Sequence, residues 1–441
     1  MFIPQYVQNC IDRLEKAGFA AYIVGGCVRD SILGLTPSDY DMCTSALPEQ
    51  TEAVFSDYGL VLAGKKHGTV GVITEGGVVE ITTFRIEGEY RDNRHPEWVK
   101  FVPEIEGDLS RRDFTVNAMA YSPTRGFADP FGGREDLKNH ILRAVGDPVA
   151  RFEEDSLRIL RGARFAAKYD LIPEEATLAA LVQLRHLMDN LARERVFEEL
   201  CKLLLSADAE DLLRFAPILA AAIPELEPMI GFDQRSPHHA YDLFTHTAHV
   251  TAGVPAELTL RWAGLLHDTG KIATFTTDET GRGHFYGHAK VSAELANEIL
   301  YRLKAPTALR EGAVELISLH MTKLPVEKKV VRRWLSKLGP EKMDALLKLQ
   351  EADMGSKGTG HEDEFAQFDQ LKALVAEIEE ENSCLSLKDL AVNGHDLMKL
   401  GLSGREIGNC LNDLLGRVLD EQLPNEKDAL LKAAAEMKCR L

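Results

Sequence analysis

The chain has 441 residues, with 51 Lys and Arg against 69 Asp and Glu, a net charge of −18, and 45% of its residues are hydrophobic. This composition excludes disorder as a description of the whole chain, and the length predicts two to four domains. The acidity excludes a protein that coats nucleic acid indiscriminately, because neutralising phosphates requires Lys and Arg.

Export and membrane insertion are not expected from the sequence. Residues 1–18 show no basic head, apolar core or small-residue cleavage site. The best apolar stretch, residues 215–223, is far shorter than the roughly 20 residues of a membrane span. The seven cysteines are scattered and form no CxxC pair, which favours reduced thiols. We therefore expect a cytoplasmic protein with no membrane partner, either a monomer or a homodimer.

The predicted elements change character along the chain. Short β-branched and aromatic runs between Gly and charged turns predict strands within residues 20–145. From about residue 150, apolar residues recur at helical intervals. A turn at residues 232–237 precedes a histidine-rich stretch that ends near residue 353, and residues 355–364 form the best linker. The pattern predicts a strand-rich head followed by a long helical body.

A glycine pair ends the first predicted strand. Gly25 and Gly26 lack a Cβ atom, so their backbone N–H groups can approach an anion closely. Arg29 follows at the start of a predicted helix, where its charge and the helix N-terminus together suit a triphosphate. These residues predict a phosphate-binding turn.

Two aspartates follow the glycine pair with the spacing i, i+2. On a strand, Asp39 and Asp41 would point to the same side and share one metal site. Glu80, within another predicted strand, offers a third carboxylate. Mg²⁺ binds one or two protein carboxylates together with substrate phosphates, and paired ions support attack of a hydroxyl on an α-phosphate. We therefore predict Asp39, Asp41 and Glu80 as catalytic residues with Mg²⁺ as cofactor.

The segment GGCVRDSILG…SDYDMCTSA resembles the nucleotidyltransferase signature of the DNA polymerase beta superfamily. The form is that of bacterial class II tRNA nucleotidyltransferases (CCA-adding enzymes) and poly(A) polymerases. Later segments resemble the family's remaining motifs in order: SRRDFTVNAMAY, ADPFGGREDL, RFEEDSLRILRGARFAAKY and ARERVFEEL. The resemblance implies an α+β fold, in which a polymerase-beta-like head with a small mixed sheet and helices precedes an all-α body.

The fourth motif carries the candidate nucleotide-selecting residues. Asp155 and Arg158 are three apart on a predicted helix and share a face, where their acceptors and donors suit the edge of a base. The resemblance implies that this pair selects CTP and ATP. Arg161 and Arg164 continue the stripe and suit the triphosphate or the RNA backbone. The alternative is a surface ion pair between Glu154 and Arg158.

The other motifs have mixed interpretations. Arg112, Asp113 and Asn117 are predicted to bind the ribose and a phosphate, with a capping role as the competing interpretation for Asp113. Glu194 and Arg195 in the fifth motif are interpreted as helix-stabilising. The glycines of ADPFGGREDL are interpreted as a turn or hinge.

Residues 85–101 are charged, contain Pro96 and lack helical periodicity, which predicts a mobile loop. The resemblance implies that enzymes adding the terminal A keep such a loop. Asp92, Arg94 and Pro96 therefore point to A addition.

The histidine-rich stretch contains an ordered set of metal-ligand types. His246, His267, Asp268 and Asp353 mix nitrogen and oxygen donors, which suits Mn²⁺, Ni²⁺ or another divalent metal. The stretch resembles an HD-superfamily phosphohydrolase domain, similar to one attached to some bacterial CCA-adding enzymes. The alternative is a degenerate domain that keeps these residues for packing or binds metal without turnover.

These patterns predict a template-independent CCA-adding tRNA nucleotidyltransferase that uses CTP, ATP and tRNA, with a possible second HD activity. The alternatives are a poly(A) polymerase, an enzyme that adds only A, a metal-dependent phosphohydrolase and an inactive RNA-binding protein. The expected domains are a nucleotidyltransferase head (1–145), a nucleotide-selecting neck (146–230), an HD domain (231–355) and a tRNA-binding body and tail (356–441).

Overall fold

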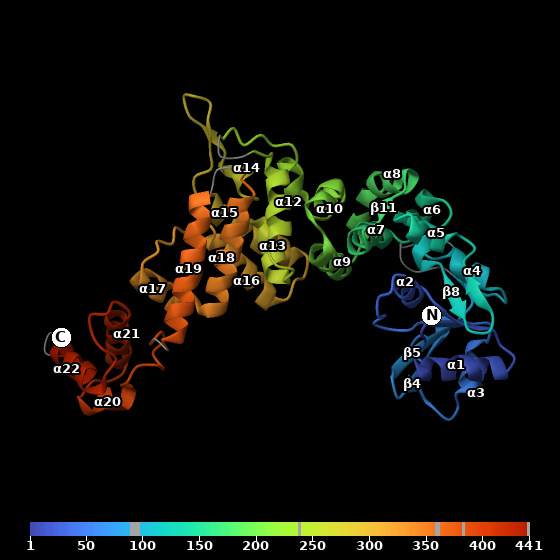
Figure 1. Cartoon of the computed structure of the whole chain (residues 1–441), viewed down its shortest axis with the longest axis horizontal. Coiled ribbons are helices and arrows are strands. Elements are labelled where there is room, and N and C mark those ends of the chain that lie inside the picture. Colours follow the sequence, from blue (N-terminus) through green and yellow to red (C-terminus); the bar gives the residue numbers. More distant parts are fainter. Residues whose placement is uncertain (89–97, 237–239, 358–361, 382–383, 439–441) are drawn as a thin grey trace. The chain divides into compact units, whose positions relative to one another are not determined.

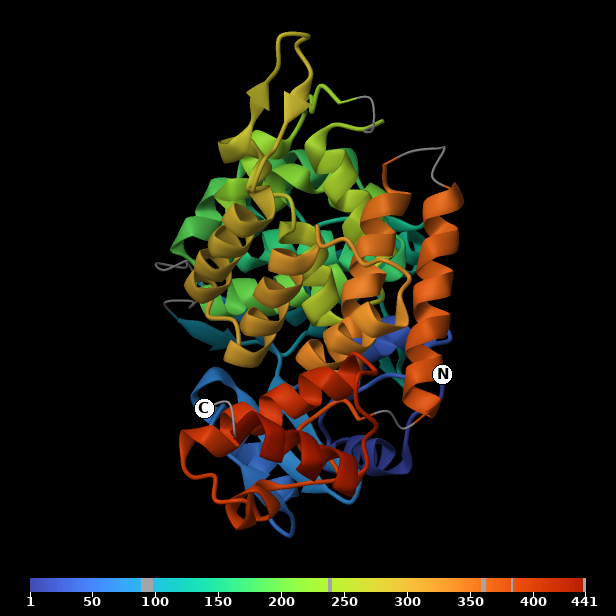
Figure 2. The same ribbon diagram turned by 90° about the vertical axis from the view of Figure 1, so that its left-hand side faces the viewer.

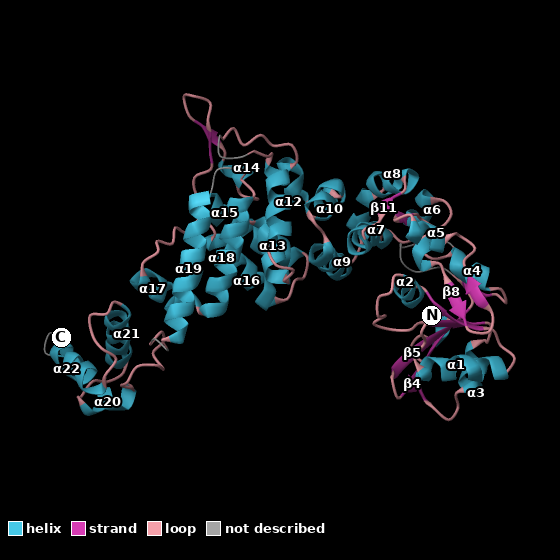
Figure 3. Cartoon of the chain, viewed as in Figure 1, coloured by secondary structure: helices cyan, strands magenta, loops and turns pink. Residues whose placement is uncertain are grey.

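The structure is a computed structural model that describes residues 1–88, 98–236, 240–357, 362–381 and 384–438. Its contacts divide the chain into two compact units. The first contains Met1–Glu227 with Arg302–Lys304, and the second contains Pro228–Tyr301 with Ala305–Leu441. Figures 1 and 3 show that the first unit combines a sheet with helices and that the second is mostly helical. The predicted α+β class is thereby confirmed.

A seven-stranded mixed sheet forms the base of the first unit, with strand order β3-β4-β5-β2-β1-β8-β9. β2 runs antiparallel to β1 and parallel to β5, which makes the sheet mixed. β4 and β5 are rich in Val, Ile and Thr, whose branched side chains favour strands. The strands are β1 (Ala21–Val24), β2 (Met42–Thr44), β3 (Gly59–Val61), β4 (Thr69–Thr74), β5 (Gly77–Thr83), β8 (Ala120–Ser122) and β9 (Gly126–Ala128).

Amphipathic helices cover the sheet and then extend the unit. In α1, the side chains of Val7, Ile11 and Leu14 recur at helical intervals and are fully buried. The helices are α1 (Gln5–Lys16), α2 (Gly26–Ile32), α3 (Pro48–Val54), α4 (Ile105–Ser110), α5 (Gly133–Lys138), α6 (Pro148–Glu154), α7 (Leu157–Tyr169), α8 (Glu175–Gln183), α9 (Arg193–Ser206), α10 (Ala209–Arg214) and α11 (Ala216–Ala222). The densest helix contact in this unit joins α7 to α9, which brings the fourth and fifth motifs together.

Two local predictions were wrong. Asp39 and Asp41 precede β2 instead of lying on it, although the Asp41 carbonyl still accepts the Val24 N–H at 2.9 Å. Asp155 and Arg158 do not share one continuous helix, because α6 ends at Glu154 and Asp155 has extended backbone angles before α7 begins. The carboxylate of Asp155 accepts the Leu157 N–H at 3.1 Å, a local bond that competes with helix continuation.

The expectation of a mobile loop at residues 85–101 stays a prediction, because the structure describes only the two ends of this segment. These ends pair as an antiparallel hairpin of β6 (Arg85–Glu87) and β7 (Val99–Phe101). Asp92, Arg94 and Pro96 lie outside the described residues.

The second unit, which includes the histidine-rich stretch, is built mostly of helices. A hairpin of β12 (Thr276–Thr277) and β13 (Gly283–His284) extends away from them (Figure 2). None of the helices in the described residues combines the length and apolar character needed to cross a membrane. The helices are α12 (Leu243–Gly253), α13 (Leu258–Leu266), α14 (Lys271–Thr274), α15 (His288–Arg302), α16 (Thr307–Leu319), α17 (Lys328–Leu338), α18 (Pro340–Gly355), α19 (Glu362–Glu380), α20 (Gly394–Lys399), α21 (Arg405–Leu419) and α22 (Lys427–Lys438).

The end of the chain has its own small core. Buried apolar side chains of α20, α21 and α22, among them Leu397, Leu414 and Leu430, pack into one cluster. α19 packs against α17 and α18 instead. The expected domain boundary at residues 355 and 356 therefore falls just before a helix that packs on the preceding one.

Candidate active sites

A cleft of 460 Å³ in the first unit gathers most of the residues that the motifs predicted. Residues from the glycine turn, the aspartate pair and the second, fourth and fifth motifs line it together. The predicted residues that line it are Gly26, Arg29, Asp39, Asp41, Arg112, Asp113, Asn117, Asp155, Arg158, Arg161 and Arg164. Glu80 is not among the lining residues.

The carboxylates at the cleft repel one another. Partial desolvation and the negative charges of Asp39 and Glu80 raise the pKa of Asp41 to about 6, against the opposing effect of Arg112. Glu80 is exposed on β5, next to Ile81, which pairs with Met42 of β2. Three acids whose negative charges act on one another suit a divalent cation, since Mg²⁺ prefers carboxylate and phosphate oxygens.

Arg29 is buried and its guanidinium is already occupied. Nε donates to Asp30 at 2.8 Å, and further hydrogen bonds reach the side chains of Asn117 and Tyr169. The guanidinium carbon also lies 4.0 Å from the centre of the Tyr169 ring. Arg29 therefore joins α2 to α7 here, and because it also lines the cleft, its role in holding the triphosphate stays a prediction.

The glycine turn has a steric requirement. Gly25 has φ of +78°, and a Cβ atom at this position would lie 2.8 Å from Nη1 of Arg112. The positive φ is the conformation that favours glycine, and the missing Cβ leaves room for the Arg112 guanidinium beside the turn.

The buried Asp113 forms an ion pair with the half-buried Arg161 in the lining of the cleft. Nη2 and Nε of Arg161 donate to Asp113 Oδ2 at 2.5 and 2.8 Å, and Asn117 donates to Oδ1 at 3.0 Å. Burial alone would raise the pKa of Asp113, but the Arg161 charge and the Asn117 hydrogen bond outweigh it and hold that pKa well below its ordinary value. Asp113 therefore stays ionised and fixes the position of Arg161.

Arg158 is also buried and engaged by the protein. Nη1 lies 2.7 Å from Glu154 Oε2 and 2.9 Å from the Arg151 carbonyl, while Nη2 lies 2.9 Å from the Arg111 carbonyl. The alternative ion pair with Glu154 is thus present, and it orients a side chain that also lines the cleft.

Two further residues at the cleft were overlooked as site residues. Tyr169 lines it next to Arg29, and Arg195 enters it from the first turn of α9. Helical spacing could have indicated Tyr169, because it lies four residues after Phe165 and its ring stacks on that residue at 6.0 Å. Arg195 required the packing of α9 on α7, which no local pattern shows.

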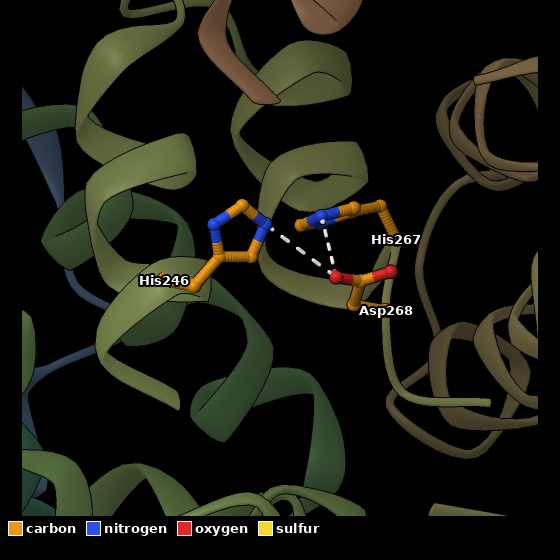
Figure 4. A group of neighbouring side chains, drawn as sticks. All are labelled: His246, His267 and Asp268. Atoms are coloured by element: carbon orange, nitrogen blue, oxygen red, sulfur yellow. Dashed lines mark ion pairs between the residues drawn. The ribbon is translucent and has the colours of Figure 1, made fainter. Parts of the chain in front are cut away.

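The second unit brings the four predicted HD residues into one buried cluster, of which Figure 4 shows His246, His267 and Asp268. His246 Nε2 lies 3.1 Å from Asp353 Oδ1 and 3.5 Å from Asp268 Oδ2, and His267 Nε2 lies 3.2 Å from Asp268 Oδ2. Burial alone would raise the pKa of Asp268, but the charges of His267 and Lys271 hold it well below its ordinary value. The ionised carboxylate and the imidazoles therefore face one point.

Asp268 also belongs to a second group of possible metal ligands, with His288 and His320. His288 Nε2 lies 3.3 Å from Asp268 Oδ1 and 3.2 Å from His320 Nε2. In both groups the histidine Nδ1 atoms bond to backbone carbonyls, as at His267 with Gly264 at 2.8 Å. With Nδ1 so engaged, each Nε2 is left to face a metal. The residues fit one or two divalent ions.

A cavity of 220 Å³ opens onto this cluster and gives a ligand access to Asp268. Lys271 and Lys357, which lie 2.8 Å from Asp268 and Asp353, also line it. The two ammonium groups beside the carboxylates suit a phosphate bound at the metal site.

The sheet, the acid pair and the arginine-lined cleft define a nucleotidyltransferase. The family models agree: "Poly A polymerase head domain" matches residues 21–143, "Probable RNA and SrmB- binding site of polymerase A" matches 170–230, and "tRNA nucleotidyltransferase domain 2" matches 274–434. The last match spans parts of the expected HD domain and tail.

The relatives make the family assignment specific, and the chain spans about half the length of some of them and nearly the whole length of others. A CCA-adding enzyme of Levilactobacillus brevis is 33% identical over 97% of this chain and 96% of its own length. That of Ligilactobacillus salivarius is 42% identical, over 52% of this chain and 59% of that enzyme. The structure of the Bacillus stearothermophilus CCA-adding enzyme in complex with CTP matches with a TM-score of 0.73 and 26% identity, over 100% of this chain and 99% of that one. The chain belongs to the CCA-adding enzyme family, which confirms the predicted family.

Proposed function

We propose that this protein adds C, C and A to tRNA 3′ ends from CTP and ATP, without a nucleic-acid template and in the cytoplasm. The observation that supports this most directly is the single cleft that holds both the acid pair Asp39 and Asp41 and the nucleotide-selecting pair Asp155 and Arg158. Catalysis and base selection then act on one bound nucleotide.

In this proposal, Asp39, Asp41 and Glu80 hold Mg²⁺, which when bound supplies charge neutralisation at the α-phosphate. The tRNA 3′-hydroxyl forms the new bond to the α-phosphorus, the bond to the β-phosphate oxygen breaks, and pyrophosphate leaves. Arg112 and Arg164 line the cleft and offer positive charge to the triphosphate. Asp155 accepts a hydrogen bond from the amino group that cytosine and adenine share, and Arg158 donates to the base.

The deciding experiment offers CTP and ATP, singly and together, to tRNAs that lack CCA, end in one C or end in CC. We expect both nucleotides to be used and the product to stop at CCA, read at single-nucleotide resolution. A poly(A) polymerase would use ATP alone and continue. An A-adding enzyme would extend only the tRNA that ends in CC.

We also propose that the histidine cluster of the second unit is a metal-dependent phosphohydrolase site. Its support is the convergence of His246, His267, Asp268 and Asp353 in a buried cluster, next to a pocket that Asp268, Asp353 and two lysines line. A site with mixed nitrogen and oxygen ligands suits Mn²⁺ or Ni²⁺ better than a site with oxygen ligands alone. By family resemblance, the substrates are 2′,3′-cyclic phosphates and 2′-nucleotides of RNA ends.

A further inference from the structure

Arg195 projects from the first turn of α9 into the nucleotide cleft. Its Nη2 atom lies 3.6 Å from Asp155 Oδ2, which is a charge contact but longer than a hydrogen bond. Its Nη1 atom is buried and has no hydrogen-bond partner. A guanidinium whose donors are incompletely used is thus held beside the carboxylate that we assign to base selection.

Helix stability does not explain this side chain. The N-terminus of an α-helix carries partial positive charge, so a cation in the first turn lowers helix stability. Glu194 in the same turn has the favourable charge, whereas Arg195 has the unfavourable one. Asp155, which lies just before α7 on which α9 packs, supplies the compensating charge. The interpretation of Arg195 as a helix-stabilising residue is therefore replaced by one that involves Asp155.

The carboxylate of Asp155 is divided between two tasks. Oδ1 accepts the Leu157 N–H at 3.1 Å and anchors the start of α7. Oδ2 faces Arg195 without a hydrogen bond between them, so its lone pairs remain able to accept from a ligand. Cytosine and adenine present an amino donor at the equivalent edge, whereas uracil and guanine present a carbonyl oxygen, which a carboxylate repels.

We propose that Arg195 is a positioning residue for nucleotide selection, which holds Asp155 Oδ2 where it accepts from the amino group of cytosine or adenine. The inference rests on the proposed nucleotide addition and extends it from the fourth motif to the fifth. Without the Arg195 charge, the Asp155 carboxylate turns away from the base and the penalty against uracil and guanine falls.

The test compares R195M, R195K and the matched control R193M in the full chain. Arg193 lies in the same helical turn and donates to the Asp189 carbonyl at 3.3 Å instead of approaching Asp155. kcat/KM is measured for CTP, ATP, UTP and GTP on tRNAs lacking CCA or ending in CC. Because one charge-assisted contact that orients Asp155 is lost, we expect R195M to lower the preference for CTP over UTP by about tenfold. R195K should keep most of it, and R193M should match the wild type.

A double variant separates positioning from a general structural role. If Arg195 acts through Asp155, D155N with R195M should show the same nucleotide preference as D155N alone. A uniform loss of rate with all four nucleotides, or an unchanged preference in R195M with an intact circular dichroism spectrum, overturns the inference. Should R195M not fold, R195K and R195Q give the same comparison. A wild type that adds neither C nor A contradicts the proposed function itself.

Discussion

Two aspartates of the same cleft, Asp41 and Asp113, have pKa values shifted in opposite directions by their neighbouring charges. Asp41 is surrounded by Asp39 and Glu80, and desolvation with these charges raises its pKa to about 6. Asp113 is paired with Arg161, which holds its pKa well below the ordinary value despite burial. An acid left among like charges is suited to a metal, whereas a paired acid is suited to structure.

The first prediction for individual residues concerns the acid pair Asp39 and Asp41. Asp41→Asn should lower nucleotide incorporation about 1,000-fold, because losing one metal ligand removes several kcal/mol of charge stabilisation from the reacting phosphate. Binding of tRNA, measured by filter retention, should be unchanged. Asp170→Asn is the control, since the Asp170 side chain is 99% exposed and its left-handed backbone suits Asn. Normal incorporation by Asp41→Asn would refute the metal assignment.

The second prediction concerns Asp113 and pH. Because the folded-state pKa lies below the unfolded one, the Asp113 carboxylate stabilises the fold above about pH 4 and loses this contribution as pH falls further. Asp113→Asn should therefore lower the free energy of unfolding at pH 7 by about 1–2 kcal/mol, since the half-buried Arg161 loses a charge-assisted hydrogen-bond partner.

Urea unfolding at several pH values measures this difference. The gap between the wild type and Asp113→Asn should narrow as pH falls below about 4. A gap that stays constant down to about pH 2, or one that widens, would contradict the ion-pair explanation.

The third motif, ADPFGGREDL, contains a glycine at which two elements, α5 and the turn at Thr115–Asn117, come into close backbone contact. A Cβ atom at Gly133, the first residue of α5, would lie 2.2 Å from the carbonyl oxygen of Thr115. Thr115 begins the short helical turn that carries Asn117, and its hydroxyl donates to Asp136 of α5 at 2.7 Å. The motif therefore packs α5 tightly against a segment that lines the cleft.

Gly133→Ala should lower the free energy of unfolding by about 1–3 kcal/mol, because the backbone must shift to relieve the overlap. The same displacement moves Asn117 and should lower kcat/KM for nucleotide addition. Gly408→Ala is the contrast: a Cβ there, within α21, meets no atom within 4 Å. We expect it to raise stability by about 0.5–1 kcal/mol through helix propensity. Equal effects of the two changes, measured by urea unfolding, would argue against close packing at Gly133.

On the scale of the whole molecule, two sites with different ligand chemistry occur in separate compact units. The first offers carboxylate oxygens of Asp39 and Asp41, and the second mixes imidazole nitrogen with carboxylate oxygen. Different donor sets select different metals, which makes the two proposed activities separable by mutation.

The prediction at this scale is a double change, H267A with D268A. It should abolish any Mn²⁺- or Ni²⁺-stimulated hydrolysis of 2′,3′-cyclic phosphates, and the variant should no longer copurify with a metal. CCA addition with Mg²⁺ should persist. His249→Ala is the matched control, because His249 lies on α12 near His246 but stacks on Tyr241. Metal content is read by mass spectrometry and folding by circular dichroism. A wild type that neither binds metal nor hydrolyses these substrates with Mg²⁺, Mn²⁺, Ni²⁺ or Co²⁺ would leave the cluster a scaffold.

The sequence by itself determined the family, the α+β class and most of the predicted residues that line the cleft, because these follow from local order: glycine turns, acid spacing and arginines at helical intervals. The tertiary structure decided what each residue does there. In the structure, α6 ends before Asp155, Arg29 donates hydrogen bonds to the side chains of Asn117 and Tyr169, and Arg195 of α9 lies beside Asp155. Such contacts depend on which helices pack together. Asp155 and Arg195 are 40 residues apart in the sequence, and the local hydrophobic periodicity of the chain does not indicate contacts over that separation.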